Sequence, residues 1–224
     1  GSELDMRLFE RLAECPDIDY LNIHIWPLNW SWIHRESVEE DLPAAIRETD
    51  RYIDEHAALA RRLRKKIVIE EFGYPRDGFE FRKGSPTSAR DAYYSHIFER
   101  LTESAEKGGE LLGCNFWGWG GLAAQNPEHI WWEPGDDYCG DPSQEEQGLN
   151  SVYMADSSTI ALIREANAKL AATVCLEFPE PESWLMCGTD RRSVKVDFFC
   201  AEDCTVKAGA AFVGDTSLMG AADT

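Results

Sequence analysis

The 224-residue sequence predicts an α/β fold built on a parallel sheet. Short apolar runs alternate with longer amphipathic segments over about the first 170 residues, in the order helix, strand, helix, strand, helix, strand, helix. Strands that are separated by helices pair in parallel through right-handed crossovers. The hydrophobic content of 43% is that of an ordinary globular domain, and no apolar run approaches the ~18 residues that a membrane span requires.

The first elements follow from leucine and isoleucine spacing. Leu4, Leu8 and Leu12 recur every fourth residue and predict a helix that ends before Pro16. Residues 18–26 then form a short apolar run that predicts a strand. A second helix is predicted by apolar residues that return to one face, namely Ile46, Ile53, Ala57 and Ala60.

The later elements repeat the alternation. Residues 67–71 predict the second strand, and Ser85 and Pro86 mark a helix start, with Ser as the cap and Pro in the first turn. Residues 111–117 predict the third strand, and Asp156 caps a last helix. The apolar faces of these two helices comprise Tyr94, Ile97, Leu101 and Ala105 in the first, and Ile160, Ile163 and Leu170 in the second.

Two arrangements accommodate this order, an open doubly wound sheet and a (β/α)8 barrel. No Gly-rich phosphate loop follows a predicted strand, which disfavours a nucleotide-binding sheet. A whole barrel needs about 250 residues and eight strands, so in a barrel residues 1–172 would form the C-terminal part. Residues 173–224 include β-rich stretches such as SVKVDFFC, which predict an incomplete β-sandwich-like accessory domain.

The charge balance limits the partners that the chain can bind. The net charge is −19, from 41 acidic and 22 basic residues, so a nucleic-acid backbone would be repelled and a neutral substrate is favoured. The seven cysteines form no close CxxC pair, and we expect neither a metal nor a cofactor. The disulfide pattern and the oligomeric state stay open. The sequence starts with Gly-Ser and shows no N-terminal signal segment.

Alternation along the outer strands predicts which side chains share a face. In the first strand the apolar set comprises Leu21, Ile23 and Ile25, and the opposite set comprises Tyr20, Asn22, His24 and Trp26. In the third strand the apolar set comprises Leu112, Cys114 and Phe116, and the opposite set comprises Gly113, Asn115 and Trp117. We therefore expect His24, Trp26 and Trp117 inside a barrel, near the C-terminal ends of the strands, where such barrels carry their chemistry.

Two adjacent carboxylates end the second strand. Neighbouring residues on a strand point to opposite faces, so Glu70 and Glu71 are not expected to form one catalytic pair. Strict alternation places Glu71 with Ile67 and Ile69, and Glu70 with Phe72. One carboxylate can face the barrel axis, and the other is solvated or supports it.

Tryptophans are frequent in the predicted loops. Trp30, Trp32, Trp131 and Trp132 lie outside the strands and helices. Indole rings above a barrel can stack on the apolar C–H faces of sugar rings. Anchoring of the loops explains such residues equally well, so both interpretations stay open.

Five motifs in order resemble one glycosidase family. IDYLNIHIWPLNWSWI, KKIVIEEFGYPRDG, SARDAYY, GCNFWGWGG and GDPSQEEQGLNSVY are similar to the C-terminal half of glycoside hydrolase family 5, subfamily 7, the endo-β-1,4-mannanases, and above all to those of gut Bacteroidetes. The resemblance covers about residues 3 to 170. It implies strands six to eight of a (β/α)8 barrel.

The resemblance also implies roles for single residues. The family's nucleophile is the Glu of a Glu-Phe-Gly strand ending, which implies Glu71. The histidine that lines the catalytic subsite corresponds to His24, and the tryptophan that forms its floor corresponds to Trp117. Trp26 stands where the wider family usually has a tyrosine that hydrogen-bonds the nucleophile. Neighbouring subsites would be lined by Trp30, Trp131 and Trp132.

One part of the family's machinery has no counterpart here. The general acid/base is the Glu of an Asn-Glu-Pro motif on strand four, and this sequence contains no Asn-Glu dipeptide. Retaining hydrolysis needs two carboxyl groups about 5–5.5 Å apart, so we expect the acid outside this chain.

The resemblance therefore implies a retaining endo-acting hydrolase of mannan, glucomannan or galactomannan that works outside the cell, in the periplasm or at the cell surface. The alternatives are a β-glucanase of the same clan, a non-catalytic carbohydrate-binding protein and an inactive fragment.

Overall fold

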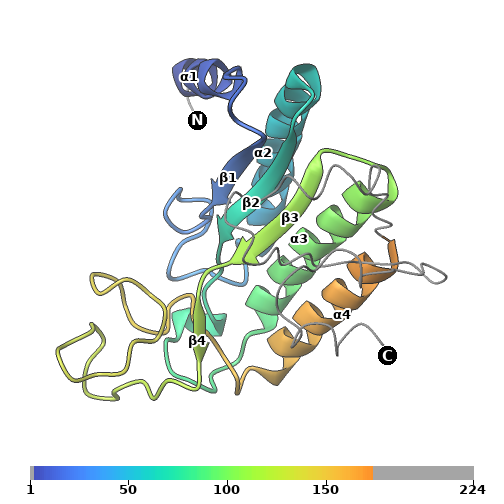
Figure 1. Ribbon diagram of the computed structural model, residues 1–224. Helices are drawn as coiled ribbons and strands as arrows, with labels where there is room; N and C mark the ends of the chain where they lie inside the picture. The colour runs from blue at the N-terminus through green and yellow to red at the C-terminus, as the bar shows by residue number, and fades with distance from the viewer. Residues whose placement is uncertain (1–2, 174–224) are drawn as a thin grey trace, which may run out of the picture. The chain divides into compact units, whose positions relative to one another are not determined.

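The computed structural model describes residues 3–173, so the predicted β-rich segment 173–224 lies outside the described part of the chain except for its first residue. Three parallel strands make the main sheet in the order β1 (Tyr20–Ile25), β2 (Lys66–Phe72), β3 (Leu111–Phe116) (Figure 1). Residues 3–167 belong to one compact unit. Within residues 3–173, every helix is too short or too polar to cross a membrane.

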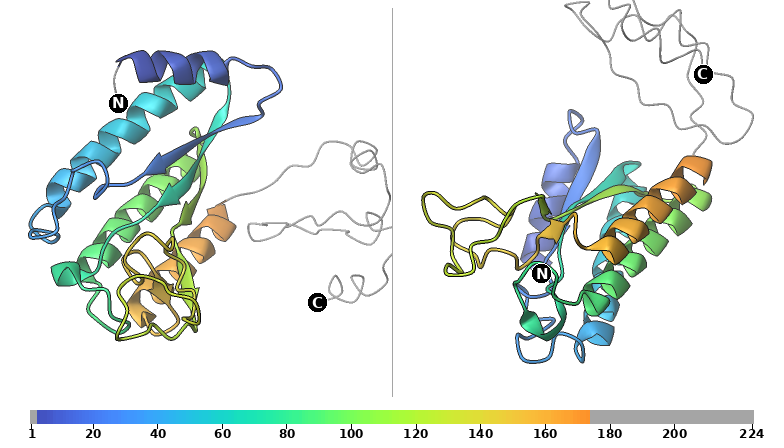
Figure 2. Two further views of the ribbon diagram at one scale, coloured as in Figure 1. Left: turned by 90° about the vertical axis from the view of Figure 1, so that its left-hand side faces the viewer. Right: turned by 90° about the horizontal axis from the view of Figure 1, so that it is seen from below.

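Helices lie along one face of the sheet. The helix α2 (Leu42–Leu63) packs on β2, and α3 (Ser88–Glu106) packs on β3 (Figure 2). The first helix, α1 (Glu3–Ala13), ends beside the start of β2, where the Lys65 ammonium donates to the carbonyls of Ala13 and Cys15 at 2.6 Å. The last helix, α4 (Ser157–Thr173), begins beside the start of α3, where the Thr159 hydroxyl donates to the Asp91 carboxylate. The alternating order is the predicted one.

The core lies between the sheet and its helices. The first strand alternates as predicted, with Leu21, Ile23 and Ile25 buried and Tyr20, Asn22 and His24 exposed. From α3, the predicted residues Tyr94, Ile97 and Leu101 are buried against the sheet. Burying each such side chain contributes roughly 1.5–3 kcal/mol to the free energy of folding. This burial determines which face of the sheet packs against the helices.

The second strand has an extra residue between Ile69 and Phe72. Ile69 pairs with Ile23, and Phe72 pairs with Ile25, so β2 advances three residues where β1 advances two. The same shift occurs against β3. This is a β-bulge at Glu70 and Glu71, and it returns Phe72 to the buried face beside Ile69. The prediction that Glu71 shares a face with Ile69, opposite Phe72, is therefore wrong.

A second irregularity corrects the face assignment in β3. The register places Ile67 opposite Leu111 and Val68 opposite Gly113, so Leu112 is an extra residue in β3. Leu111 is buried and Leu112 is 60% exposed. The prediction that Leu112 packs with the helices is therefore wrong, because the register shift gives that place to Leu111.

Aspartate side chains make polar contacts at the starts of the last two long helices. Helix α3 begins at Ser88 with Thr87 at the cap position, two residues after the predicted cap Ser85, because the Asp77 carboxylate accepts the N–H groups of Ser88 and Ala89 at 2.9 and 2.8 Å. Helix α4 begins at Ser157, directly after Asp156, as expected, and the Asp156 carboxylate also accepts the backbone N–H of Tyr153 at 2.8 Å. A short parallel pair, β4 (Trp119–Gly121) and β5 (Val152–Tyr153), lies where only a loop was predicted.

Candidate active site

The carboxyl ends of the strands bring a histidine between two carboxylates. His24 pairs with Glu71 across β1 and β2, and its Nδ1 lies 3.0 Å from Glu71 Oε2. The other ring nitrogen, Nε2, lies 3.5 Å from Glu70 Oε2. The Glu71 side chain is 27% exposed, against 44% for Glu70 and for His24. Alternation predicted that Glu70 faces away from Glu71. This prediction is wrong, because the bulge turns both carboxylates toward His24.

Two tryptophans lie beside this histidine at the same end of the sheet. Trp26 follows β1 and Trp117 follows β3, and their rings meet edge to face with centroids 6.4 Å apart. The backbone N–H of Trp117 donates to the carbonyl of Phe72 at 2.8 Å, which fixes the backbone of Trp117 against the end of β2. The structure therefore places four predicted site residues at one end of the sheet, namely His24, Trp26, Glu71 and Trp117. Among the described contacts, Trp26 makes no hydrogen bond to Glu71.

Gly73 makes room for this arrangement. A Cβ atom on Gly73 would lie 2.8 Å from a ring carbon of Trp26 and 2.8 Å from Oδ1 of Asn150. Both approaches are closer than side chains tolerate, so the Glu-Phe-Gly ending needs glycine at its third position. The contribution of Asn150 was not predicted, because it lies on a distant loop.

We expect Gly73→Ala to displace Trp26 and to destabilise the fold by about 1–3 kcal/mol, the usual cost of overpacking. Urea unfolding followed by tryptophan fluorescence measures both effects. Gly113→Ala is the matched control, since a Cβ there meets no atom within 4 Å. Equal midpoints for the two variants would contradict the close contact at Gly73.

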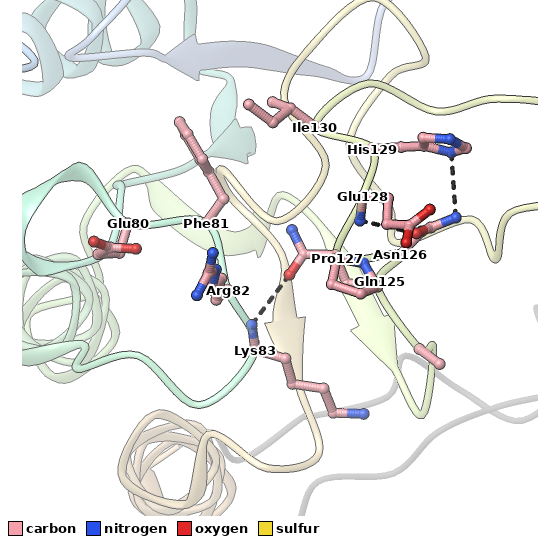
Figure 3. A pocket seen from close by; sticks show the side chains of 11 residues that line it. Glu80, Phe81, Arg82, Lys83, Gln125, Asn126, Pro127, Glu128, His129 and Ile130 are labelled. Carbon is pink, nitrogen blue, oxygen red and sulfur yellow. Dashed lines mark hydrogen bonds between the residues drawn. The ribbon is translucent and has the colours of Figure 1, made fainter.

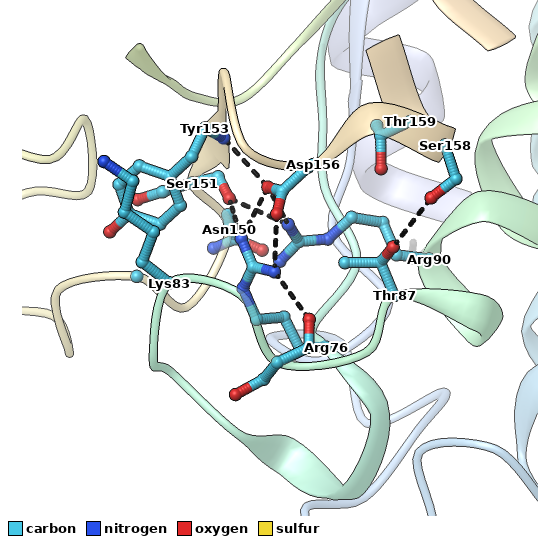
Figure 4. Close-up of polar contacts among 12 residues, drawn as sticks. Arg76, Lys83, Thr87, Arg90, Asn150, Ser151, Tyr153, Asp156, Ser158 and Thr159 are labelled. Atoms are coloured by element: carbon cyan, nitrogen blue, oxygen red, sulfur yellow. Dashed lines mark hydrogen bonds and ion pairs between the residues drawn. The ribbon is translucent and has the colours of Figure 1, made fainter. Parts of the chain in front are cut away.

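Behind the site, buried arginines hold the loops together (Figure 4). The Arg76 guanidinium donates to both carboxylate oxygens of Asp156, at 2.9 and 2.6 Å, and both side chains are almost fully buried. Arg90 donates to the carbonyls of Tyr74, Ser151 and Leu149 at 2.7, 2.8 and 2.9 Å. These bonds tie the segment after β2 to the segment before α4. No short motif identifies this network, because its members are far apart in the sequence.

Asp141 organises the same segment from the other side. Its carboxylate accepts the backbone N–H groups of Gly148 and Asn150 at 2.8 and 2.9 Å, and the Ser151 hydroxyl at 2.5 Å. Burial raises the pKa of Asp141, and these hydrogen bonds act in the opposite direction. The bonds fix the backbone at Asn150, whose amide oxygen abuts Gly73.

Trp30 packs against α2. Its ring lies 4.9 Å from that of Trp32 and 5.1 Å from that of Tyr52, centroid to centroid, and Trp30 is 38% exposed. These contacts match the anchoring interpretation of the loop tryptophans, and part of the Trp30 ring stays accessible.

Trp131 and Trp132 lie on the long loop between β4 and β5. The Trp132 indole N–H donates to the carbonyl of Asp136 at 3.1 Å, whereas Trp131 is 50% exposed. His129 Nδ1 lies 2.9 Å from the Asp136 carboxylate, and this hydrogen bond raises the pKa of His129. Hydrogen bonds from Asn126 and from His129 lower the pKa of Asp136. Hydrogen bonds within this loop, centred on Asp136, thus hold the loop that carries Trp131.

An open cleft of about 790 Å³ lies between this loop and the loop after β2 (Figure 3). It is lined by residues 80–83 and 124–130. The Lys83 backbone N–H donates to the Gln125 amide oxygen at 3.2 Å across it. None of the predicted site residues lines this cleft.

The described cysteines are free thiols, namely Cys15, Cys114 and Cys139. Burial raises the pKa of Cys114 to about 12. Among residues 3–173, no group of three or more His, Cys, Asp or Glu side chains is arranged to hold a metal ion.

Comparisons with known proteins agree on one family. Mannan endo-1,4-beta-mannosidase 2 of Oryza sativa subsp. japonica is 27% identical over 166 residues, which cover 73% of this chain and 31% of the rice protein. Mannan endo-1,4-beta-mannosidase 2 of Arabidopsis thaliana is 28% identical over 109 residues, covering 49% of this chain and 23% of that protein.

The crystal structure of a glycoside hydrolase family 5 mannosidase from Rhizomucor miehei is similar in fold. It is 31% identical, with a TM-score of 0.66, over 75% of this chain and 41% of that chain. A Glu-to-Ala mutant of the same enzyme in complex with mannosyl-fructose is 30% identical, with a TM-score of 0.65, over 75% of this chain and 41% of that one. The predicted fold class, the C-terminal part of a (β/α)8 barrel, is confirmed.

The chain spans about a third of the length of the rice relative and about two fifths of the fungal enzyme. The family model described as GH family 5 beta-mannosidase-like matches residues 1–174. The chain therefore belongs to this glycoside hydrolase family.

Proposed function

We propose that this chain supplies the nucleophile and the floor of the catalytic subsite to a retaining endo-β-1,4-mannanase of subfamily 7. The observation that carries the proposal is the contact of 3.0 Å between His24 and Glu71, beside the Trp26–Trp117 pair, at the carboxyl ends of parallel strands. Family 5 relatives named as mannan endo-1,4-beta-mannosidases support the substrate class. The complex of a fungal relative with mannosyl-fructose supports it as well.

In the proposed mechanism, the Glu71 carboxylate attacks the anomeric carbon of a mannosyl unit. The bond from that carbon to the leaving sugar oxygen breaks, and a carboxylic acid protonates this oxygen. The same group then deprotonates a water molecule, which attacks the glycosyl-enzyme and releases Glu71 as a carboxylate. No metal or cofactor takes part in these steps.

The acid/base has to stand across the glycosidic bond from Glu71, with the two carboxyl groups about 5–5.5 Å apart. Glu70 contacts the same imidazole as Glu71 and so lies beside the nucleophile. We propose that the acid/base belongs to a part of the enzyme outside this sequence.

We propose that His24 orients the nucleophile and that Trp117 stacks under the reacting sugar. Trp26 shapes the wall of this subsite through its contact with Trp117. Trp131, which is half exposed, is the strongest candidate for a neighbouring subsite. Trp30 and Trp132 are weaker ones, because their rings are partly engaged in packing or hydrogen bonding.

We also propose that the enzyme acts outside the cell, in the periplasm or at the cell surface, because a polymeric substrate does not cross a membrane unaided.

A substrate panel tests this proposal. We expect the chain extended through barrel strands one to five to hydrolyse mannan and glucomannan and to leave cellulose intact, and the 224-residue chain alone to hydrolyse none of them. Release of reducing ends measures both. Cleavage of cellulose or β-glucan alone would favour the β-glucanase alternative, and binding without cleavage by the extended chain would favour a carbohydrate-binding protein. Turnover by the 224-residue chain would contradict an acid/base outside it.

A further inference from the structure

We propose that Glu70 is a positioning residue that holds the imidazole of His24 through Nε2 while Nδ1 faces Glu71; this inference rests on the proposed role of Glu71 as nucleophile. The contacts are 3.5 Å from Nε2 to Glu70 Oε2 and 3.0 Å from Nδ1 to Glu71 Oε2. Both oxygens lie on consecutive residues of one strand, which a regular strand would point to opposite faces.

The bulge in β2 is not needed to orient the nucleophile. If Glu70 were absent, simple alternation would bury Ile69, expose Glu71 and bury Phe72, which is how the structure arranges these three residues. The extra residue leaves Glu71 and Phe72 on their faces and adds one feature, a second carboxylate at His24. Bulges beside active sites commonly redirect a side chain in this way.

The two carboxylate contacts, one at each ring nitrogen, fix the orientation of the imidazole. A contact at Nδ1 alone leaves the ring free to pivot about it, and the Glu70 oxygen at Nε2 removes that freedom. Because Glu70 and His24 are each 44% exposed, solvent weakens the contact, so its effect is on orientation more than on stability.

Glu70 matters most once the covalent intermediate has formed. Glu71 is then an ester and a weaker partner for Nδ1. Glu70 keeps its contact of 3.5 Å with Nε2, so it holds the ring in place until water attacks and Glu71 is released. The structure thus gives Glu70 a role in both halves of the reaction without making it the acid.

Kinetics of the extended enzyme test this role. We expect Glu70→Ala to lower kcat for mannan by about 10-fold, as the loss of other supporting partners does, with KM changed less than about 2-fold. Glu70→Gln, which keeps an acceptor oxygen, should recover part of the loss. Glu99→Gln, an exposed residue on α3, is the matched control and should behave as the wild type.

A spectroscopic readout on the 224-residue chain is independent of turnover. At fixed pH, the ¹⁵N signal of His24 Nε2 should change in Glu70→Ala and stay unchanged in Glu99→Gln. Wild-type kcat and an unchanged Nε2 signal in Glu70→Ala would overturn the inference. The proposed function would fail separately, through an active Glu71→Gln enzyme.

Discussion

Replacing Glu71 by Gln in the extended enzyme is expected to lower kcat for mannan hydrolysis by about 10⁴-fold or more, the scale at which loss of a covalent nucleophile acts. The amide is a poor nucleophile and forms no glycosyl-enzyme. The substitution keeps the size of the side chain and an oxygen that can accept from His24 Nδ1. Initial rates of reducing-end release, compared at saturating mannan, measure the effect.

The design separates lost chemistry from lost structure. Glu71→Gln should bind mannooligosaccharides within about 2-fold of the wild-type affinity, and Glu99→Gln should keep full activity. A Glu71→Gln enzyme within about 10-fold of the wild-type kcat would show that another residue carries the nucleophilic step.

Removing Arg76 is expected to have the largest effect on stability. Arg76→Leu leaves the Asp156 carboxylate buried without its bidentate partner, and loss of one member of a buried ion pair costs about 3–5 kcal/mol. The two side chains are 0% and 2% exposed, so water cannot replace the missing partner. Urea unfolding of the 224-residue chain gives the change in the free energy of unfolding.

Two further variants make this result specific. Arg51 on α2 forms exposed ion pairs with Glu48 and Glu55, so Arg51→Gln should leave the unfolding midpoint nearly unchanged. The double variant Arg76→Leu, Asp156→Leu should be more stable than Arg76→Leu alone, because the buried carboxylate is removed together with its bidentate partner. Arg90, whose Nη1 lies 4.0 Å from Asp156, keeps its three carbonyl acceptors. A loss below about 1 kcal/mol in Arg76→Leu would contradict a structural role for the pair.

The sequence predicted the regular parts of the molecule well. In β1 the side chains alternate strictly, so His24 could be placed opposite the core from the pattern alone. The apolar spacing along α2 and α3 predicted their existence and the buried positions Ile53 and Ile97. Alternation and helical period depend on local geometry, which a single sequence carries.

The wrong predictions concern features that depend on residues distant in the sequence, namely strand register and side-chain contacts between loops. Whether β2 or β3 holds an extra residue depends on its neighbours, so the faces of Glu70 and Leu112 were assigned wrongly. The start of α3 depends on Asp77, and the Asp156 side chain turns to Arg76, which lies 80 residues earlier in the chain. These contacts hold the loops behind the candidate site in place, and no short sequence motif predicts them.

The central claim is that Glu71 forms the covalent bond to mannose, and trapping tests it most directly. The extended enzyme is incubated with a 2-deoxy-2-fluoro-β-mannosyl fluoride, which leaves a slowly hydrolysed glycosyl-enzyme. Trypsin releases the peptide of residues 67–76, which contains Glu70 and Glu71. Fragmentation in the mass spectrometer should place the fluoromannosyl group on Glu71. A label on Glu70 or on any other residue would contradict the assignment.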